Sequence, residues 1–214
     1  MLAAIRSAAV VGIDAYDVCV EVDVAQGLPH WTIVGLPSGE VKESRERVTA
    51  ALANSGFVVP ARRVTVSLSP GDQRKAGTGF DLPIAVGLLV ALGALSPERV
   101  DGIVFFGELG LDGAIRPVRG VLSVARHLAE SDSLRGLVIP SPNVAEASLV
   151  RSLCVFTAES LASLVESLQA SSLSRADRVL ESVVNDETVD FADVSGQESA
   201  KRALEIAAVG ATTC

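Results

Sequence analysis

A strand, a glycine-rich loop and a wholly apolar helix follow one another between Val64 and Leu89, and this segment constrains the fold most strongly. Its sequence is VTVSLSPGDQRKAGTGFDLPIAVGLL. The first residues alternate between apolar and polar side chains, which predicts a half-buried strand. Ser-Pro-Gly ends the strand. The run from Leu82 to Leu95 carries no charge, which predicts a helix buried on most sides. We expect Asp81 to be the N-cap of that helix.

The remaining sequence predicts strands first, and then helices and strands in alternation. Residues 16–24 alternate strictly, with valines on one face and Cys19, Glu21 and Asp23 on the other. Asp112-Gly113 predicts the turn of a hairpin. Antiparallel early strands followed by alternating elements favour a mixed α/β, or α+β, domain. The other expected strands are 1–13, 31–34, 103–106, 137–139 and 154–156, and the other expected helices are 39–55, 120–131, 144–151 and 160–169.

Composition limits the kinds of surface that this chain can present. The 214 residues are 49% apolar and carry a formal net charge of −8. An acidic chain is a poor general nucleic-acid binder, because phosphate contacts require clustered lysine and arginine. A local basic patch at Arg62, Arg63, Arg74 and Lys75 remains an alternative. We interpret these four residues as solvated ends of elements.

The cysteines and the apolar segments indicate the compartment. Cys19, Cys154 and Cys214 are far apart and have no CxxC spacing, so we expect no zinc site. Cys19 and Cys154 lie in strand-like runs, and we interpret them as small core residues. The odd number of cysteines and the absence of a signal-peptide pattern favour a reducing cytoplasm. The longest apolar run, 82–95, is too short to span a bilayer.

Three segments carry a resemblance to a known family: KAGTGFDLPIA, the LSP before it, and the upstream GLPSGEVKESRERV. They resemble the N-terminal domain of magnesium-chelatase-like AAA+ ATPases of the ComM/YifB type. The resemblance covers 1–169 and resumes at Asp190. It implies a fold like the Lon proteolytic domain, also called ribosomal-protein-S5-domain-2-like. We therefore expect a Lon-like domain at 1–169, a linker at 170–189, and the start of an AAA+ module at 190–214, truncated before the ATP-binding loop.

Lon-type proteases use a Ser–Lys dyad, and the resemblance locates both positions in this chain. In the loop KAGTG, Gly79 falls on the serine. In the segment GELGLDGAIRPVRGVLSVA, Leu122 falls on the lysine. Covalent catalysis needs a nucleophile and a base within hydrogen-bond reach, so we expect no catalytic residue here. Thr78 as a substitute nucleophile and Lys75 as a substitute base remain open.

We expect the central loop to serve structure or contacts with a partner through Lys75, Gly77, Thr78, Gly79 and Asp81. Its glycines let the backbone turn tightly before the helix. Its GTG lacks the ending of the phosphate-binding motif GxxxxGK[ST], which occurs nowhere in the sequence. A weak anion site at Lys75 is the remaining binding alternative. We expect no cofactor and no metal in this chain, whereas the resemblance implies ATP and Mg²⁺ for full-length members.

Four further residues have side chains of the kind found in catalytic sites, but they lie in no recognisable motif. His30 and His127 have no companion motif, and we interpret both as structural or solvent-facing. Glu108 and Asp112 bracket the expected hairpin, where a carboxylate pair could perform acid–base work. We interpret these two as turn and rim residues.

Three functions from different classes follow. The favoured one is a non-catalytic accessory or assembly domain of a magnesium-chelatase-like AAA+ ATPase, inactive by itself. The resemblance implies ATP-driven DNA branch migration, recombination and competence for full-length members, with partners through self-association, the AAA+ module or DNA, and no membrane. The second is a Ser–Lys-type peptidase with a lost or substituted dyad. The third is a stand-alone nucleic-acid-binding module.

Overall fold

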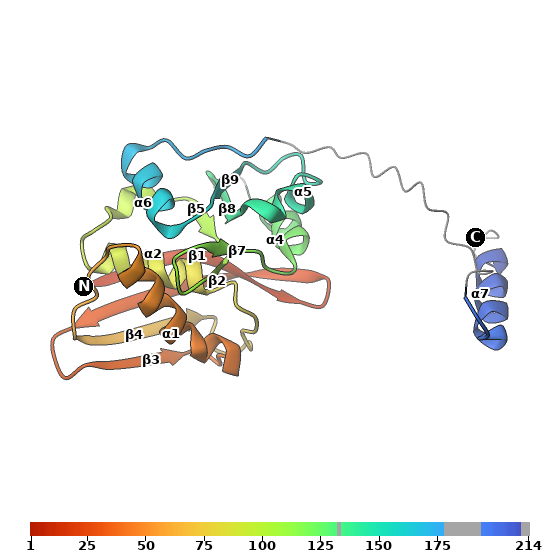
Figure 1. Ribbon diagram of the computed structural model, residues 1–214, viewed down its shortest axis with the longest axis horizontal. Coiled ribbons are helices and arrows are strands. Elements are labelled where there is room, and N and C mark those ends of the chain that lie inside the picture. Colours follow the sequence, from red (N-terminus) through yellow and green to blue (C-terminus); the bar gives the residue numbers. More distant parts are fainter. Residues whose placement is uncertain (132–133, 178–193, 211–214) are drawn as a thin grey trace. The chain divides into compact units, whose positions relative to one another are not determined.

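The computed structural model describes residues 1–131, 134–177 and 194–210 (Figure 1). It divides into two compact units, Met1–Leu180 and Glu181–Cys214, and each is described by itself. The expected linker at 170–189 lies within the described residues only as far as 177. The expected segment at 190–214 is described from 194 to 210.

A seven-stranded mixed sheet forms the centre of the first unit, in the order β3-β4-β2-β1-β5-β8-β9 (Figure 1). The pairs β1–β2 and β2–β4 are antiparallel, whereas β3–β4, β1–β5, β5–β8 and β8–β9 are parallel. This mixture confirms the predicted fold class. The strands are β1 Leu2–Val11, β2 Asp14–Ala25, β3 His30–Val34, β4 Arg63–Ser69, β5 Ile103–Phe105, β8 Gly136–Pro140 and β9 Val155–Ala158, and a separate hairpin contains β6 Glu108–Leu109 and β7 Ile115–Arg116.

The antiparallel half of the sheet buries one face, as the alternation of its sequence predicts. Val20 and Val22 of β2 are fully buried, and Glu21 between them is half-buried. Antiparallel sheets commonly pack one face on the core in this way. Cys19 shares the face of Glu21, and Cys154 is also only half-buried. The interpretation of these two cysteines as core residues is therefore wrong.

The parallel half of the sheet is covered on both faces. Phe105 of β5 and Val138 of β8 belong to the main core, together with buried residues of the first, second and sixth helices. Val104 and Leu137, one position away on the same strands, belong to a second core with residues of the fourth and fifth helices. Parallel strands buried on both faces have near-continuous apolar sequences, as β5 and β8 do.

The central helix α2, Asp81–Ala91, is buried along its whole length. A Cβ added at Gly87 would lie 2.7 Å from a methyl group of Val22, so the glycine lets the helix approach β2 closely. The helix ends before the predicted Leu95, because Gly93 adopts φ +78°, a left-handed conformation outside the helical range.

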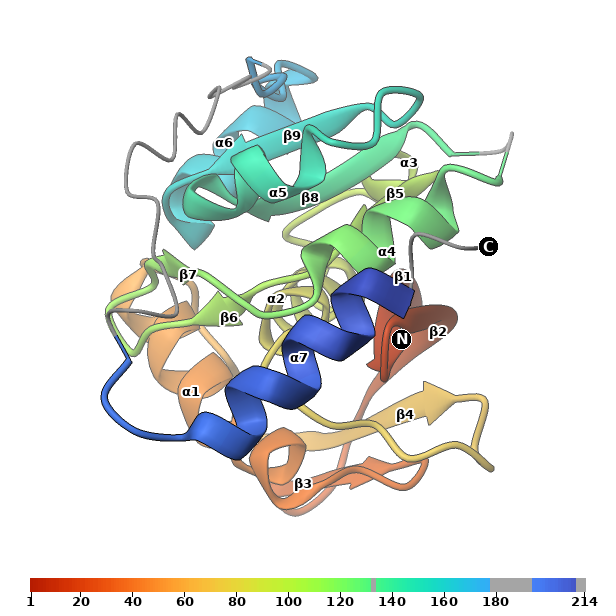
Figure 2. The same cartoon turned by 90° about the vertical axis from the view of Figure 1, so that its right-hand side faces the viewer.

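The remaining helices of the first unit have local sequence signals at their starts. Ser38 is the N-cap of α1 and accepts a hydrogen bond from the Val41 N–H at 3.4 Å. Ser160 and Ser163 form a capping box at the start of α6. Figure 2 shows these elements from the side. The helices are α1 Gly39–Asn54, α3 Pro97–Val100, α4 Val121–Leu128, α5 Val144–Ala147 and α6 Leu161–Ala170, with a 3₁₀ turn η1 at Ser141–Asn143.

The described part of the second unit contains α7, Glu198–Gly210. Leu204, Ile206 and Val209 are exposed on this helix, and an Arg202–Glu205 ion pair of 3.1 Å lies on its surface. None of the helices in the described part of the chain has the length and apolar character needed to cross a bilayer.

Candidate functional site

The loop between β4 and α2 is fastened to the beginning of α1. The Lys75 N–H donates to the Leu36 carbonyl at 3.1 Å, and the Ser38 N–H donates to the Lys75 carbonyl at 2.8 Å. The Gly77 N–H donates to Oε2 of Glu40 at 3.0 Å. Three bonds to one neighbouring segment hold the central loop in a defined conformation. The loop is therefore fixed to its neighbour despite its glycine-rich sequence.

The side chain of Lys75 lies inside the loop. It is fully buried, and its Nζ donates to the carbonyl oxygens of Pro70 and Gln73, the latter at 2.8 Å. Burial lowers the pKa of this ammonium group, while nearby Asp72 acts in the opposite direction. The interpretation of Lys75 as a solvated end is wrong, because the loop carbonyls take up its donors. This placement also removes the basis for an exposed anion site at Lys75.

Gly79 is packed directly against an aromatic ring. A Cβ added at this position would lie 2.2 Å from Cε2 of Phe106 and 2.7 Å from two other ring carbons. The backbone of Gly79 does not have a positive φ, whereas Gly77 has φ +85°. Gly77 therefore serves the tight turn that the sequence predicts. Gly79 allows close packing, because the ring of Phe106 occupies the space that a side chain at this position would need.

The prediction of Asp81 as an N-cap is wrong. Phe80 occupies the N-cap position, and Asp81 is the first residue of α2. Its fully buried carboxylate accepts two hydrogen bonds from Arg47, at 2.6 Å from Nε and 3.0 Å from Nη2. It also accepts the Leu109 N–H at 3.3 Å. Burial raises the pKa of the Asp81 carboxyl, and the bonds from Arg47 act against that rise. This pair joins α1, α2 and the β6–β7 hairpin beneath the central loop.

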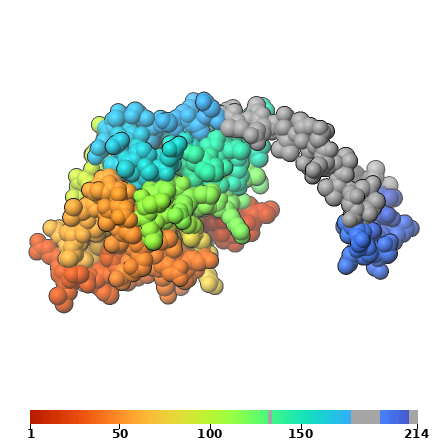
Figure 3. Space-filling view, viewed as in Figure 1, coloured from red at the N-terminus to blue at the C-terminus, as the bar shows by residue number. Residues whose placement is uncertain are grey.

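α1 lies against the β6–β7 hairpin. Atoms of α1, in orange, and of the hairpin region, in green, lie side by side on one face of the first unit (Figure 3). Arg47 itself is mostly covered, with 19% of its side chain exposed, whereas Glu43 one turn earlier is 74% exposed. Glu43 and Arg47 form an i,i+4 ion pair at 3.8 Å. Glu43 therefore pairs with the same guanidinium from its solvent-exposed side.

The segment that leads into α4 is held by two polar side chains of η1 and α5. Asn143 accepts the Val118 N–H at 3.1 Å and donates to the Val118 carbonyl at 2.8 Å. Glu146 accepts the Leu122 N–H at 2.8 Å through Oε1, and its Oε2 accepts from Asn143 at 3.3 Å. These bonds fix the chain before α4. At Leu122 the hydrogen bond comes from the backbone N–H, and the leucine side chain itself is apolar.

A pocket of about 330 Å³ is lined by the central loop and by the segment before α4. Gly77, Thr78 and Gly79 contribute from the loop. Its charged lining residues are Glu40, Glu108 and Arg119, and Leu122 is not among the lining residues. The structure therefore brings together three of the five predicted loop residues, leaves Lys75 and Asp81 buried behind them, and places Leu122 outside the pocket lining.

Sequence comparison identifies the family. The profile of the family described as "Subunit ChlI of Mg-chelatase" matches residues 20–143, more than half of the chain. The chain belongs to this Mg-chelatase ChlI family. It is 42% identical over 214 residues to "Competence protein ComM" of Haemophilus influenzae, covering 98% of this chain and 42% of that protein.

Further members of the Mg-chelatase ChlI family give the same extent of match. The chain is 37% identical over 209 residues to an uncharacterised protein named YifB of Salmonella typhimurium, covering 98% of this chain and 41% of the relative. It is 40% identical over 210 residues to an uncharacterised protein of Mycobacterium tuberculosis, covering 96% and 41%. The chain therefore spans less than half the length of these relatives.

In this Mg-chelatase ChlI family member, the predicted dyad positions carry no reactive side chain. Gly79 has none, and Phe106 fills the adjacent space. Leu122 is aliphatic. The substitute base Lys75 donates to two loop carbonyls and is closed off from solvent. Thr78 lines the pocket, but Lys75, the base expected to activate its hydroxyl, donates to the loop carbonyls instead.

The pocket contains three charged residues that sequence reasoning did not assemble. Glu108 was interpreted as a rim residue, and it lines the pocket. The sequence does not predict Glu40 or Arg119 as site residues, because each lies in a segment whose pattern indicates only a structural role. Glu40 lies in α1, far in sequence from Glu108 and Arg119, so only the fold brings all three together. Asp112, the other hairpin carboxylate, accepts the Ala114 N–H at 3.1 Å and is a turn residue, as predicted.

Both histidines lie away from this pocket. His127 is 3.6 Å from Asp17, at the surface between α4 and β2, and His30 is exposed at the start of β3. Within the described residues, no group of three or more histidine, cysteine, aspartate or glutamate side chains could hold a metal ion.

Proposed function

We propose that this chain is a non-catalytic accessory domain of a Mg-chelatase-like AAA+ ATPase. The observation that carries the proposal is the ring of Phe106 against Gly79. A nucleophilic side chain at this position would begin at a Cβ that lies 2.2 Å from the ring, well inside van der Waals contact. With Leu122 at the second position, the pocket lacks the nucleophile and base that covalent catalysis requires. A fold shared with proteases does not by itself imply their activity.

The family and the length of its members support a role of the domain in a larger assembly. The relative named "Competence protein ComM" is more than twice as long as the stretch matched here. We place ATP and Mg²⁺ binding, ring assembly, DNA branch migration and recombination with full-length members. The domain would act in the cytoplasm, through contact with a second copy or with the ATPase module.

A peptidase with a substituted dyad is the runner-up, and the placement of Lys75 disfavours it. The Nζ of Lys75 would have to leave two carbonyl acceptors to serve Thr78 as a base. A stand-alone nucleic-acid-binding module is disfavoured by the net charge of −8.

The first test concerns peptidase activity. Incubation of the chain with unfolded casein and a serine-reactive fluorophosphonate probe should give no cleavage and no labelled protein. Thr78→Ala should behave identically to the parent, because we assign Thr78 no catalytic part. Trypsin in the same assay provides the positive control. Labelling of Thr78 that disappears in Thr78→Ala would contradict the proposal and restore the peptidase.

The second test concerns the accessory role and uses the full-length Haemophilus relative. Removing the region matched by this chain should leave ATP hydrolysis measurable and should reduce the assembled size in sedimentation, because the ATPase chemistry lies elsewhere. Fusing this chain in its place should restore the larger size, since the two sequences are 42% identical. Unchanged assembly after the deletion would contradict an assembly role, and ATP hydrolysis by this chain alone would contradict the accessory assignment.

A further inference from the structure

The central sheet has one closed edge and one open edge. At β9, the Thr157 N–H donates to the Ser174 carbonyl at 3.2 Å, and the Ala176 N–H donates to the Val155 carbonyl at 2.9 Å. The chain after α6 therefore covers that edge. At the other end, β3 pairs with β4 alone among the described residues. Figures 1 and 2 show β3 as the outermost strand.

The open strand carries no protecting residue within its span. Its sequence is HWTIV, without proline, lysine or acidic residues. Exposed apolar side chains lie at its end and on either side of it: 43% of Val34, 89% of Leu28 and 53% of Leu36 are exposed. Unpaired backbone groups on such a strand form a template for one more strand. Proteins that keep an edge like this commonly use it to bind extended peptides.

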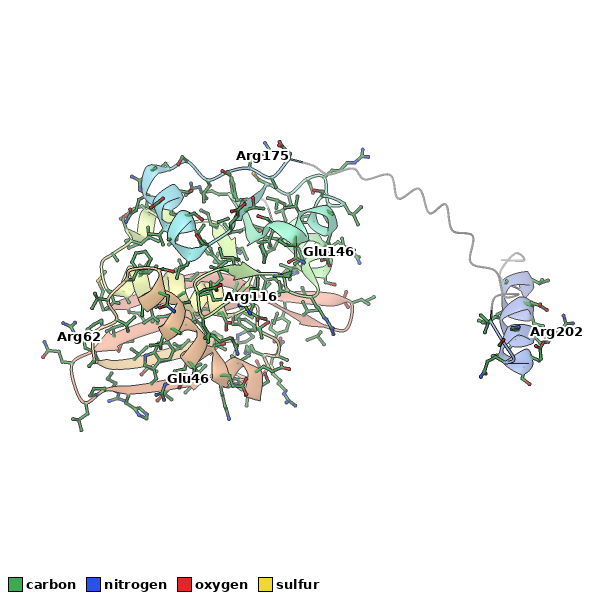
Figure 4. The ribbon with its side chains drawn as sticks, viewed as in Figure 1. Glu46, Arg62, Arg116, Glu146, Arg175 and Arg202 are labelled. Carbon is green, nitrogen blue, oxygen red and sulfur yellow. The ribbon has the colours of Figure 1, made fainter. Side chains whose placement is uncertain are left out.

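The start of β3 adjoins a pocket with a single sign of charge. This pocket, of about 270 Å³, lies between α1, β3 and the loop before β4. His30, Trp31, Arg45 and Arg62 line it, and none of its described lining residues is acidic. Figure 4 shows Arg62 projecting away from the first unit. The chain as a whole is strongly acidic, so a pocket lined by cationic side chains next to an open strand is a specific departure from the average surface.

One carboxylate lies nearby without neutralising the pocket. Nε of Arg45 is 3.4 Å from Oε1 of Glu46, and both side chains are more than half exposed. Exposed pairs of this kind contribute little, because water solvates both partners. A carboxylate of a bound ligand can therefore replace Glu46 at small cost. The guanidinium of Arg62 is exposed and has no ion-pair partner among the described residues.

Charge decides which kind of strand fits this edge. A two-fold pairing of β3 with a second copy would be antiparallel, and the paired strand HWTIV would bring no carboxylate to the arginines of the pocket. A nucleic-acid strand would use the ring of Trp31 as a stacking platform, but this ring is half-buried and packs against the main core. An acidic peptide satisfies both features, since its backbone pairs with β3 and its carboxylates meet Arg45 and Arg62.

We propose that β3 and the adjoining cationic pocket form a docking site for an extended acidic peptide segment of a partner protein. The peptide adds as an eighth strand beside β3, with main-chain hydrogen bonds for affinity and carboxylates in the pocket for selectivity. The site shares no lining residue with the pocket beside Gly79, so it is independent of the lost dyad.

The chain provides its own reporter for this site. Trp31 is its one tryptophan, so tryptophan emission reports on this pocket alone. The probe is an acetylated peptide of about nine residues, the length of one long strand, with alternating glutamate and valine. It should change the emission saturably at low salt. The matched peptide with lysine in place of glutamate should bind at least about tenfold more weakly, which corresponds to one charge interaction of ~1.4 kcal/mol.

Two further comparisons separate charge from strand pairing. Arg62→Glu should weaken the glutamate peptide by about tenfold or more, while Arg126→Glu, a change at another exposed arginine of the first unit, should leave it within about twofold. Methylating alternate backbone nitrogens of the peptide should abolish binding, because it removes the donors of an added strand. Circular dichroism of Arg62→Glu checks that the variant is folded.

Several outcomes would overturn the proposal. The site is not an acidic-peptide site if neither peptide binds, or if both bind alike. Tighter binding of oligothymidylate than of the glutamate peptide would reassign the pocket to single-stranded nucleic acid. A dimer in sedimentation that the peptide dissociates would show that the occupant of β3 is a second copy.

Discussion

Replacing Arg47 with alanine is expected to lower the free energy of unfolding by about 3–5 kcal/mol at pH 7, the range for removing one partner of a buried ion pair. The variant deprives the buried Asp81 carboxylate of its cation and leaves it the Ser44 hydroxyl and the Leu109 N–H, the latter at 3.3 Å, as donors. Chemical denaturation of the parent and Arg47→Ala, followed by circular dichroism, measures the difference. Glu43→Ala is the matched control, since it removes only the exposed partner of the same guanidinium. Its effect should stay below about 0.5 kcal/mol.

The pH dependence of this loss distinguishes an unpaired charge from lost packing. Burial already raises the pKa of Asp81, and Arg47 opposes the rise, so removing Arg47 raises that pKa further. A raised pKa favours folding while the carboxyl is protonated, below its unfolded value of about 3.9, and this contribution is lost as pH increases through the folded value. The difference between parent and Arg47→Ala should therefore be smaller at about pH 4 than at pH 7. A difference that is constant with pH would assign the loss to packing.

The sequence predicts the strands of this domain well because their burial repeats every second residue. Val18, Val20 and Val22 alternate with polar or small residues, and the structure buries those valines. The short helix α3 and the turn η1 were not predicted, since each is too short to show a helical period. Boundaries also differ by a few residues, most clearly at the end of α2.

The roles within the central loop could not be read from local sequence. Asp81 precedes an apolar run and therefore resembles an N-cap, but its partner Arg47 lies 34 residues earlier. Lysine in a glycine-rich loop normally indicates a solvated charge. Lys75 is buried because the loop folds back and offers it two carbonyl acceptors. Each outcome depends on contacts across the fold, which periodicity does not encode.

Replacing Gly79 with valine is expected to lower the free energy of unfolding by about 3 kcal/mol, at the upper end of the range for overpacking a core. The new Cβ would lie 2.2 Å from Cε2 of Phe106, whose ring is 5% exposed and packs in the second core. The ring therefore has little freedom to move aside. Gly77→Ala is the comparison within the same loop, because its Cβ meets open space and its cost of about 1 kcal/mol would come from φ +85° alone.

A double variant tests whether Phe106 is the cause. Phe106→Ala alone should destabilise by about 3–5 kcal/mol through the cavity that it leaves. In that background, Gly79→Val should cost much less than in the parent, because the added side chain enters the vacated space, and the two changes should not be additive. An equal cost in both backgrounds would show that some other neighbour limits the site. The same geometry predicts that Gly79→Ser does not regain reactivity towards the fluorophosphonate probe, since the hydroxyl would need the space of the ring and Leu122 still supplies no base.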